Sequence, residues 1–110
     1  MTVNEISSAL NLRLLSGSKG LDKEVKDVYI CDLLSFVMSH AREESLWITV
    51  QTHINIVAVA VLIGISCIVV PENISVDEDT LLKADEEVIP IFTTEYNSYK
   101  LACMLKALEL

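Results

Sequence analysis

A polar cluster between two apolar runs, within residues 47–60, constrains the fold of this chain more than any other sequence feature. The run before it, residues 46–50, is short and nearly all apolar, which is typical of a strand inside a parallel sheet. If the run after it, residues 54–63, were a second strand, residues 51–55 would have to form a hairpin, and they lack its turn chemistry. We therefore expect a strand, a polar turn and then a helix.

The rest of the chain alternates helix and strand signals in the same way. The apolar segments 66–70 and 88–92 are typical of two further buried strands. From residue 46 onward the order is strand, helix, strand, helix, strand, helix, which predicts parallel strands joined by right-handed crossovers. The other expected elements are a helix opened by the capping-box spacing of Thr2 and Glu5, strands at residues 12–15 and 25–30, and helices capped by Asp32, by Ser75 and by Thr93 or Thr94.

Length and composition favour one domain over residues 1–110. A chain of 110 residues with 52% hydrophobic residues can bury a core without metal or disulfide support. Together with the alternating elements, this predicts an α/β fold of three layers, in which a small, mostly parallel sheet lies between helices.

Charge and cysteine content restrict the expected partners. The formal net charge of −8 repels nucleic-acid backbones and anionic lipid surfaces, so neither is expected as a partner. Cys31, Cys67 and Cys103 are odd in number, widely spaced and set in apolar surroundings, which predicts reduced core thiols in a cytoplasmic protein.

No targeting or membrane segment is expected. The N-terminus lacks the basic and apolar regions of a secretion signal. Residues 54–70 carry no charge and approach the minimum length of a membrane span. Asn55, Gly64 and Ser66 interrupt this run, and no lysine or arginine anchors its ends, so we expect it to lie in the domain.

Ligands of open α/β sheets bind beyond the carboxyl ends of the strands, and the turns at residues 31–35, 51–55 and 93–98 fit that position. Thr52 and His53, with the free N–H groups of the following helix, could hold an anionic group. Alternatively, Thr52 caps the helix and His53 is solvated in its first turn. The candidate ligand-binding residues are Asp32, Ser35, Gln51, Thr52, His53 and Asn55.

The sequence contains no convincing catalytic motif. Asp32, Ser35 and His53 are the residue types of a nucleophilic triad, but no nucleophile-elbow pattern surrounds the serine. Residues 17–20 lack the spacing of a phosphate loop, so a plain turn is expected there. The two histidines have no zinc-site spacing. We therefore expect no enzymatic activity, no metal site and no cofactor.

Two families share motifs with this chain. The motifs at residues 2–6, 10–12 and 16–25 resemble the opening of the N-terminal, non-catalytic domain of HPr kinase/phosphorylase. The motifs at residues 32–38 and 47–60 resemble the stand-alone members of the DRTGG-domain family. Together the resemblances cover nearly the whole chain, and they imply the fold of those domains.

The family signature is only partly present. Where the signature has Gly-Asp-Arg, this chain has Cys31-Asp32-Leu33, and where it has Thr-Gly-Gly, this chain has Gln51-Thr52-His53. Related domains are fused to phosphotransacetylases and to CBS-domain regulatory proteins, and some stand-alone members are encoded beside iron-hydrogenase subunits. The resemblance thus implies a regulatory or interaction role, and an enzyme partner such as a hydrogenase-associated complex.

Two classes of function remain. We favour a non-catalytic regulatory or accessory module that self-associates, most simply as a homodimer, because aromatic residues and methionine favour interface cores. The alternative is a sensor that binds a small anionic ligand, such as a nucleotide, at the strand-to-helix turns. The candidate interface residues are Phe36, Met38, Trp47, Tyr96 and Tyr99.

Overall fold

A five-stranded sheet forms the middle layer of the computed structural model, which describes residues 1–110. The strands are β1 (Arg13–Ser16), β2 (Asp27–Ile30), β3 (Ser45–Ile48), β4 (Cys67–Val70) and β5 (Ile91–Thr93). Their order across the sheet is β1-β5-β4-β3-β2. Strands β2 to β5 are parallel, and β1 pairs antiparallel with β5 at one edge.

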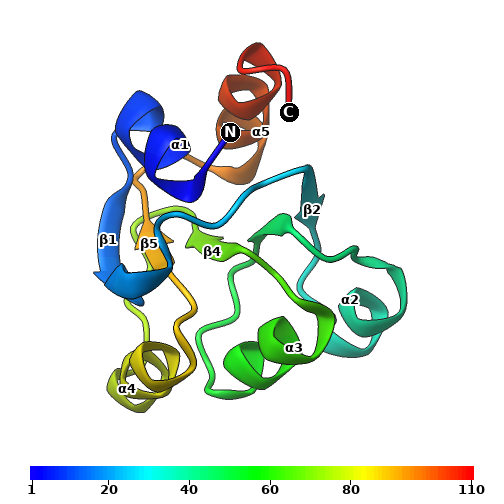
Figure 1. Cartoon of the computed structure of the whole chain (residues 1–110), viewed down its shortest axis with the longest axis vertical. Coiled ribbons are helices and arrows are strands. Elements are labelled where there is room, and N and C mark those ends of the chain that lie inside the picture. The colour runs from blue at the N-terminus through cyan, green and yellow to red at the C-terminus, as the bar shows by residue number, and fades with distance from the viewer.

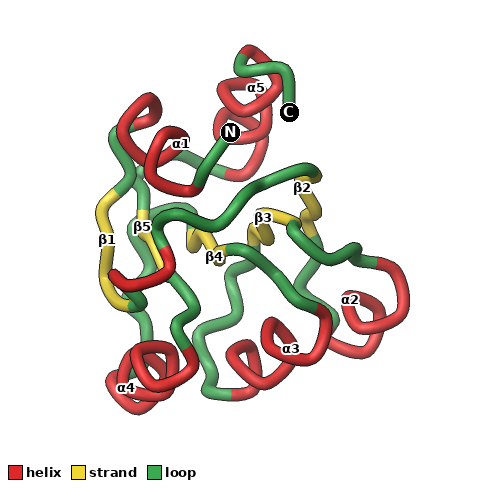
Figure 2. Tube along the Cα trace, viewed as in Figure 1, coloured by secondary structure: helices red, strands yellow, loops and turns green.

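Helices cover both faces of this sheet. One face carries α1 (Val3–Leu10) and α5 (Ser98–Ala107). The other carries α2 (Leu34–His40), α3 (Asn55–Ile63) and α4 (Glu78–Glu87). Figure 1 shows the two groups of helices on opposite sides of the strands, and Figure 2 shows how short the strands are relative to the loops that join them.

The three-layer α/β fold expected from the sequence is confirmed. Residues 46–48 pair in parallel with residues 67–69, and residues 68–70 with residues 91–93. The helix expected at residues 54–63 is α3, and it ends at Gly64, whose φ of 85° is in the left-handed region that favours glycine. The capping box of Thr2 and Glu5 is present at the start of α1.

The uncharged run at residues 54–70 is divided between α3 and β4. The apolar residues of this run therefore contribute to the core from two separate elements, a helix and a strand. No helix in the structure has the length and apolar character needed to cross a membrane.

Three predicted helix caps were wrong. The carboxylate of Asp32 accepts hydrogen bonds from the neighbouring turn, and Thr94 Oγ1 accepts one from the N–H of Tyr96. Asp32 and Thr94 thus bond within or between loops, and all three helices start later than the sequence spacing predicted. The observed N-cap residues of α2, α4 and α5 are Leu33, Asp77 and Asn97.

The prediction of buried cysteines holds only in part. Cys67 is buried in β4, and burial raises the pKa of its thiol to about 12. Cys103, expected in the core, is exposed on α5. Tyr99 on the same helix is 80% exposed, whereas Leu101 and Leu105 are buried. The reason is that α5 packs on the sheet through one side only, and Cys103 and Tyr99 lie off that side.

Trp47 links the core to the turn after β2. Its side chain is fully buried, and its indole N–H donates to the carbonyl oxygen of Cys31 at 2.9 Å. We expect Trp47→Phe to lower the free energy of unfolding by about 2–4 kcal/mol, because it leaves a cavity and an unpaired carbonyl. Urea unfolding followed by circular dichroism measures the change. Tyr99→Phe, at an exposed site, should change stability by less than about 0.5 kcal/mol, and equal midpoints for both variants would contradict the role of Trp47.

Candidate functional site

Four strand ends meet at one edge of the sheet. The parallel strands β2, β3, β4 and β5 all finish there, and the antiparallel β1 begins there, because Arg13 pairs with Thr93. We call this the carboxyl edge. It carries the turns that the sequence singled out for ligand binding.

Asp32 ties the turn after β2 to the turn after β3. Its Oδ1 accepts hydrogen bonds from Thr49 Oγ1 and from the N–H of Val50, both at 2.9 Å. Gln51 Nε2 donates back to the carbonyl oxygen of Asp32 at 3.0 Å, and the N–H of Gln51 donates to Thr49 Oγ1 at 3.2 Å. One carboxylate oxygen is therefore engaged in holding two loops together.

Thr52 continues this connection to α4. Its hydroxyl donates to Asp77 Oδ1 at 3.3 Å, and its carbonyl oxygen accepts from the buried hydroxyl of Thr80 at 2.7 Å. The alternative that Thr52 caps the following helix is wrong, because α3 has no side-chain cap. His53 is exposed, and its Nδ1 accepts from the N–H of Asn55 at 3.2 Å.

The structure places all six predicted ligand residues at the carboxyl edge, in two groups. One group is tied together by hydrogen bonds within and between the loops and comprises Asp32, Gln51 and Thr52. The other makes no side-chain hydrogen bond to another loop and comprises Ser35, His53 and Asn55; of all six residues, only Thr52 is not exposed. None of the six lines any of the five main hollows of the surface.

The predicted interface residues do not form one patch. Phe36 and Met38 are about half exposed on α2, whereas Tyr99 lies on α5 in the other helical layer. Tyr96 is half-buried in the turn before α5. The prediction that Trp47 is an interface residue was wrong. Helices cover both faces of β3 and leave no part of the Trp47 side chain exposed.

Two adjoining hollows open at the carboxyl edge beside β1 and β5. Their volumes are about 230 Å³ and 240 Å³, and both are lined by Arg13, Asn73 and Thr93. Thr93 belongs to one of the turns expected from the sequence, whereas Arg13 and Asn73 were not among the expected site residues. Arg13 could not be placed from its sequence position, because only the antiparallel pairing of β1 brings its first residue to this edge. The single signal was an arginine in the strand expected at residues 12–15, whose other residues are all leucine.

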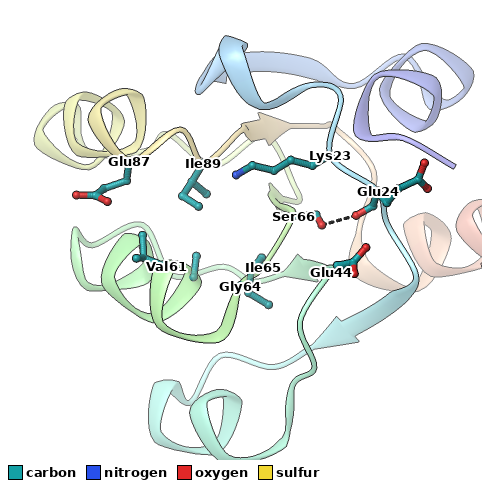
Figure 3. A pocket seen from close by; sticks show the side chains of 10 residues that line it. Lys23, Glu24, Glu44, Val61, Gly64, Ile65, Ser66, Glu87 and Ile89 are labelled. Carbon is teal, nitrogen blue, oxygen red and sulfur yellow. Dashed lines mark hydrogen bonds between the residues drawn. The ribbon is translucent and has the colours of Figure 1, made fainter.

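A further hollow, of about 460 Å³, lies at the opposite edge of the sheet (Figure 3). Lys23 reaches into it and donates from Nζ to the carbonyl oxygen of Val88, and burial lowers the pKa of this ammonium group. The acidic side chains around it are already engaged in ion pairs: Glu24 with the N-terminal ammonium, Glu44 with Lys26 and Glu87 with Lys83. No group of three or more histidine, cysteine or acidic side chains in the structure could hold a metal ion.

The molecule is thus an α/β domain with its polar turns collected at the carboxyl edge of a parallel sheet. The family model of the DRTGG domain matches residues 5–108, so the chain belongs to the DRTGG-domain family. No curated protein matches the chain.

Among solved structures, the chain is similar to the CBS and DRTGG domains of the regulatory region of Clostridium perfringens pyrophosphatase, complexed with the activator diadenosine tetraphosphate. The TM-score is 0.75 at 14% sequence identity, and the match covers 94% of this chain and 45% of that chain. This chain therefore spans less than half of the matched protein. At this identity the likeness shows a shared fold.

The role of Asp32 can be tested by removing its carboxylate. Asp32→Ala should lower the free energy of unfolding by about 1–2 kcal/mol, because the hydroxyl of the buried Thr49 loses its acceptor and the two loops lose the bonds made by this carboxylate. Thermal or urea unfolding provides the measurement. Ser35→Ala, at an exposed serine whose hydroxyl bonds to no other group, is the matched control. If the two variants are equally stable, Asp32 does not hold the loops together.

Proposed function

We propose that this protein is a non-catalytic regulatory or accessory module that acts through self-association and protein contacts. Its membership of the DRTGG-domain family supports this, because the similar solved domains form part of a regulatory region. The same proposal includes three further points. The first part of the chain is similar to the N-terminal domain of HPr kinase/phosphorylase, the protein is cytoplasmic, and its partner is an enzyme such as a hydrogenase-associated complex.

An apolar surface at the free edge of the sheet carries the proposal. Strand β2 has no neighbour on its outer side, and α2 packs beside it. Five large apolar side chains in and next to these elements are 40–63% exposed, namely Ile30, Leu33, Phe36, Met38 and Val50. We call this set the apolar edge. Exposed apolar groups concentrated in this way are characteristic of interaction surfaces.

A second copy of the chain is the simplest partner for the apolar edge. Two identical patches can cover each other about a two-fold axis, which is the commonest symmetry of soluble oligomers. The net charge of −8 opposes association. Salt screens exposed charges beyond about 8 Å at physiological strength, whereas the gain from apolar burial is hardly affected. Burial should therefore dominate.

We expect a species of twice 12.2 kDa in sedimentation or light scattering at micromolar concentration. The double variant Phe36→Glu/Met38→Glu should shift the equilibrium to the monomer, because it places two charges inside the interface. A mass that stays at 12.2 kDa as concentration and salt rise would contradict self-association.

The matched control for this experiment is Leu62→Glu. Leu62 is 73% exposed, but it belongs to a separate apolar hollow beside α3 and α4. This variant should remain dimeric. If it dissociates while the Phe36/Met38 variant does not, the interface lies on α3 and α4 and the apolar edge is not the contact surface.

A second candidate function is the binding of a small anionic ligand, such as a nucleotide, at the strand-to-helix turns. The observation that favours it is the activator in the complex of the similar regulatory region, diadenosine tetraphosphate. In this chain the exposed His53 and Asn55 would supply donors at the start of α3, and the hydroxyl of Thr52 would exchange its hydrogen bond to Asp77 for one to the ligand. Asp32, Ser35 and Gln51 complete the proposed set.

Diadenosine tetraphosphate is the probe for this second function. If the site lies before α3, a Thr52→Ala/His53→Ala double variant should bind the probe about 5-fold to 150-fold more weakly, since losing the hydrogen bonds of both side chains costs roughly 1–3 kcal/mol. Calorimetric titration measures the affinity, and Ser8→Ala, at an exposed serine on α1, is the control. Unchanged affinity in the folded double variant would place any such ligand elsewhere.

A further inference from the structure

Three polar residues lie at the carboxyl edge beside β1 and β5, namely Arg13, Asn73 and Thr93. They are separate from the six candidate ligand residues of the turns after β2 and β3. Arg13 and Thr93 are directly paired across antiparallel strands, so their side chains lie on the same face of the sheet. Asn73 lines the same two hollows. The turn that carries it is held against the end of β5, because the N–H groups of Glu72 and Asn73 donate to Tyr96 and Thr94 carbonyl oxygens at 2.9 Å and 2.8 Å.

The hydroxyl of Thr93 has no partner within the protein. Thr93 is only 6% exposed, and its Oγ1 is buried without a hydrogen bond. Burying a hydroxyl without a partner is costly, so a native structure that retains one has a reason for it. The residue lines both hollows, so its hydroxyl lies just beneath their surface, with almost no exposed area of its own.

The other two side chains are also free. Arg13 is exposed and takes part in none of the ion pairs of the structure. The side-chain amide of Asn73 bonds to no other protein group. Its backbone has a φ of 56°, in the left-handed region. A guanidinium, an amide and a hydroxyl supply several donors and one positive charge, which suits a tetrahedral oxyanion.

One acidic side chain restricts which anions the hollow can bind. Glu95 lines the more polar of the two hollows and is exposed. A carboxylate there repels a bare phosphate ion but accepts hydrogen bonds from hydroxyl groups. Lys100 Nζ lies 5.4 Å from the centre of the ring of Tyr96, which lines the same hollow, and brings a positive charge to that side chain.

We propose that Arg13, Asn73 and Thr93 form a binding site for the phosphate group of a hydroxyl-bearing phosphate monoester. Arg13 and Asn73 hold the phosphate oxygens at the mouth, and rotation of the Thr93 side chain turns its hydroxyl outward to donate to the oxygen that enters deepest. Glu95 accepts a hydrogen bond from a hydroxyl of the ligand. This site is independent of self-association and of the turn before α3.

The test uses ribose 5-phosphate and inorganic phosphate as probes, followed by amide chemical shifts of the full chain. We expect saturable shifts around residues 13, 73 and 93, with ribose 5-phosphate bound several-fold more tightly than phosphate. Arg13→Gln should weaken binding of both probes about tenfold or more, the effect expected from losing a charged hydrogen bond. The chain's other arginine, Arg42, is exposed, and Arg42→Gln should leave binding unchanged.

Thr93→Val separates a ligand role from a packing role. Valine keeps the shape and removes the unpartnered hydroxyl, so the variant should be at least as stable as the native protein. Weaker binding of both probes by this stable variant supports the proposal. Unchanged binding would show that the hydroxyl is not a ligand and would overturn its assigned role.

Three further outcomes are decisive against the proposal. Absence of saturable shifts with either probe overturns the site. Equal weakening by Arg13→Gln and Arg42→Gln means that the anions respond only to net charge. Weakening by Thr52→Ala/His53→Ala, with Arg13→Gln unaffected, places the anion before α3. The oligomeric mass, measured on the same samples, reports separately on self-association.

Discussion

Every side chain of β3 and β4 is buried, and the rest of the structure depends on covering both faces of these two strands. Three helices follow β2, β3 and β4 on one face, while α1 and α5, from the two ends of the chain, cover the other. Covering both faces requires crossovers, which set the strands parallel and bring their carboxyl ends to one edge. The position of the polar turns is therefore a consequence of how the apolar strands are buried.

Polar side chains at that edge have two different uses. At the β2 and β3 end, Asp32 and Thr52 bond to neighbouring loops and to α4, so they stabilise the arrangement of the turns. At the β1 and β5 end, Arg13 and the Thr93 hydroxyl have no protein partner. A satisfied hydrogen-bonding group gains little from a ligand, whereas an unsatisfied one gains much, and this difference favours the second end for binding a small anion.

The exposed apolar groups occupy another part of the surface. The apolar edge surrounds β2 and α2, whereas the hollows with Arg13 lie at the opposite border of the sheet. A dimer formed through the apolar edge would leave those hollows open to solvent. Self-association and anion binding can thus operate in one chain without competing for the same residues.

The sequence by itself determined the fold class, because the apolar runs at residues 46–50 and 66–70 and the alternating helices leave few arrangements other than a covered parallel sheet. It also located the polar turns, since strand ends can be recognised from local pattern. It did not determine whether each polar group is satisfied or free. Three residues show this. Trp47 is enclosed, the Asp32 carboxylate is hydrogen-bonded, and the Thr93 hydroxyl has no partner, and each state depends on residues distant in the chain. Only the tertiary structure decided these states, because burial and hydrogen bonding depend on which segments meet in space.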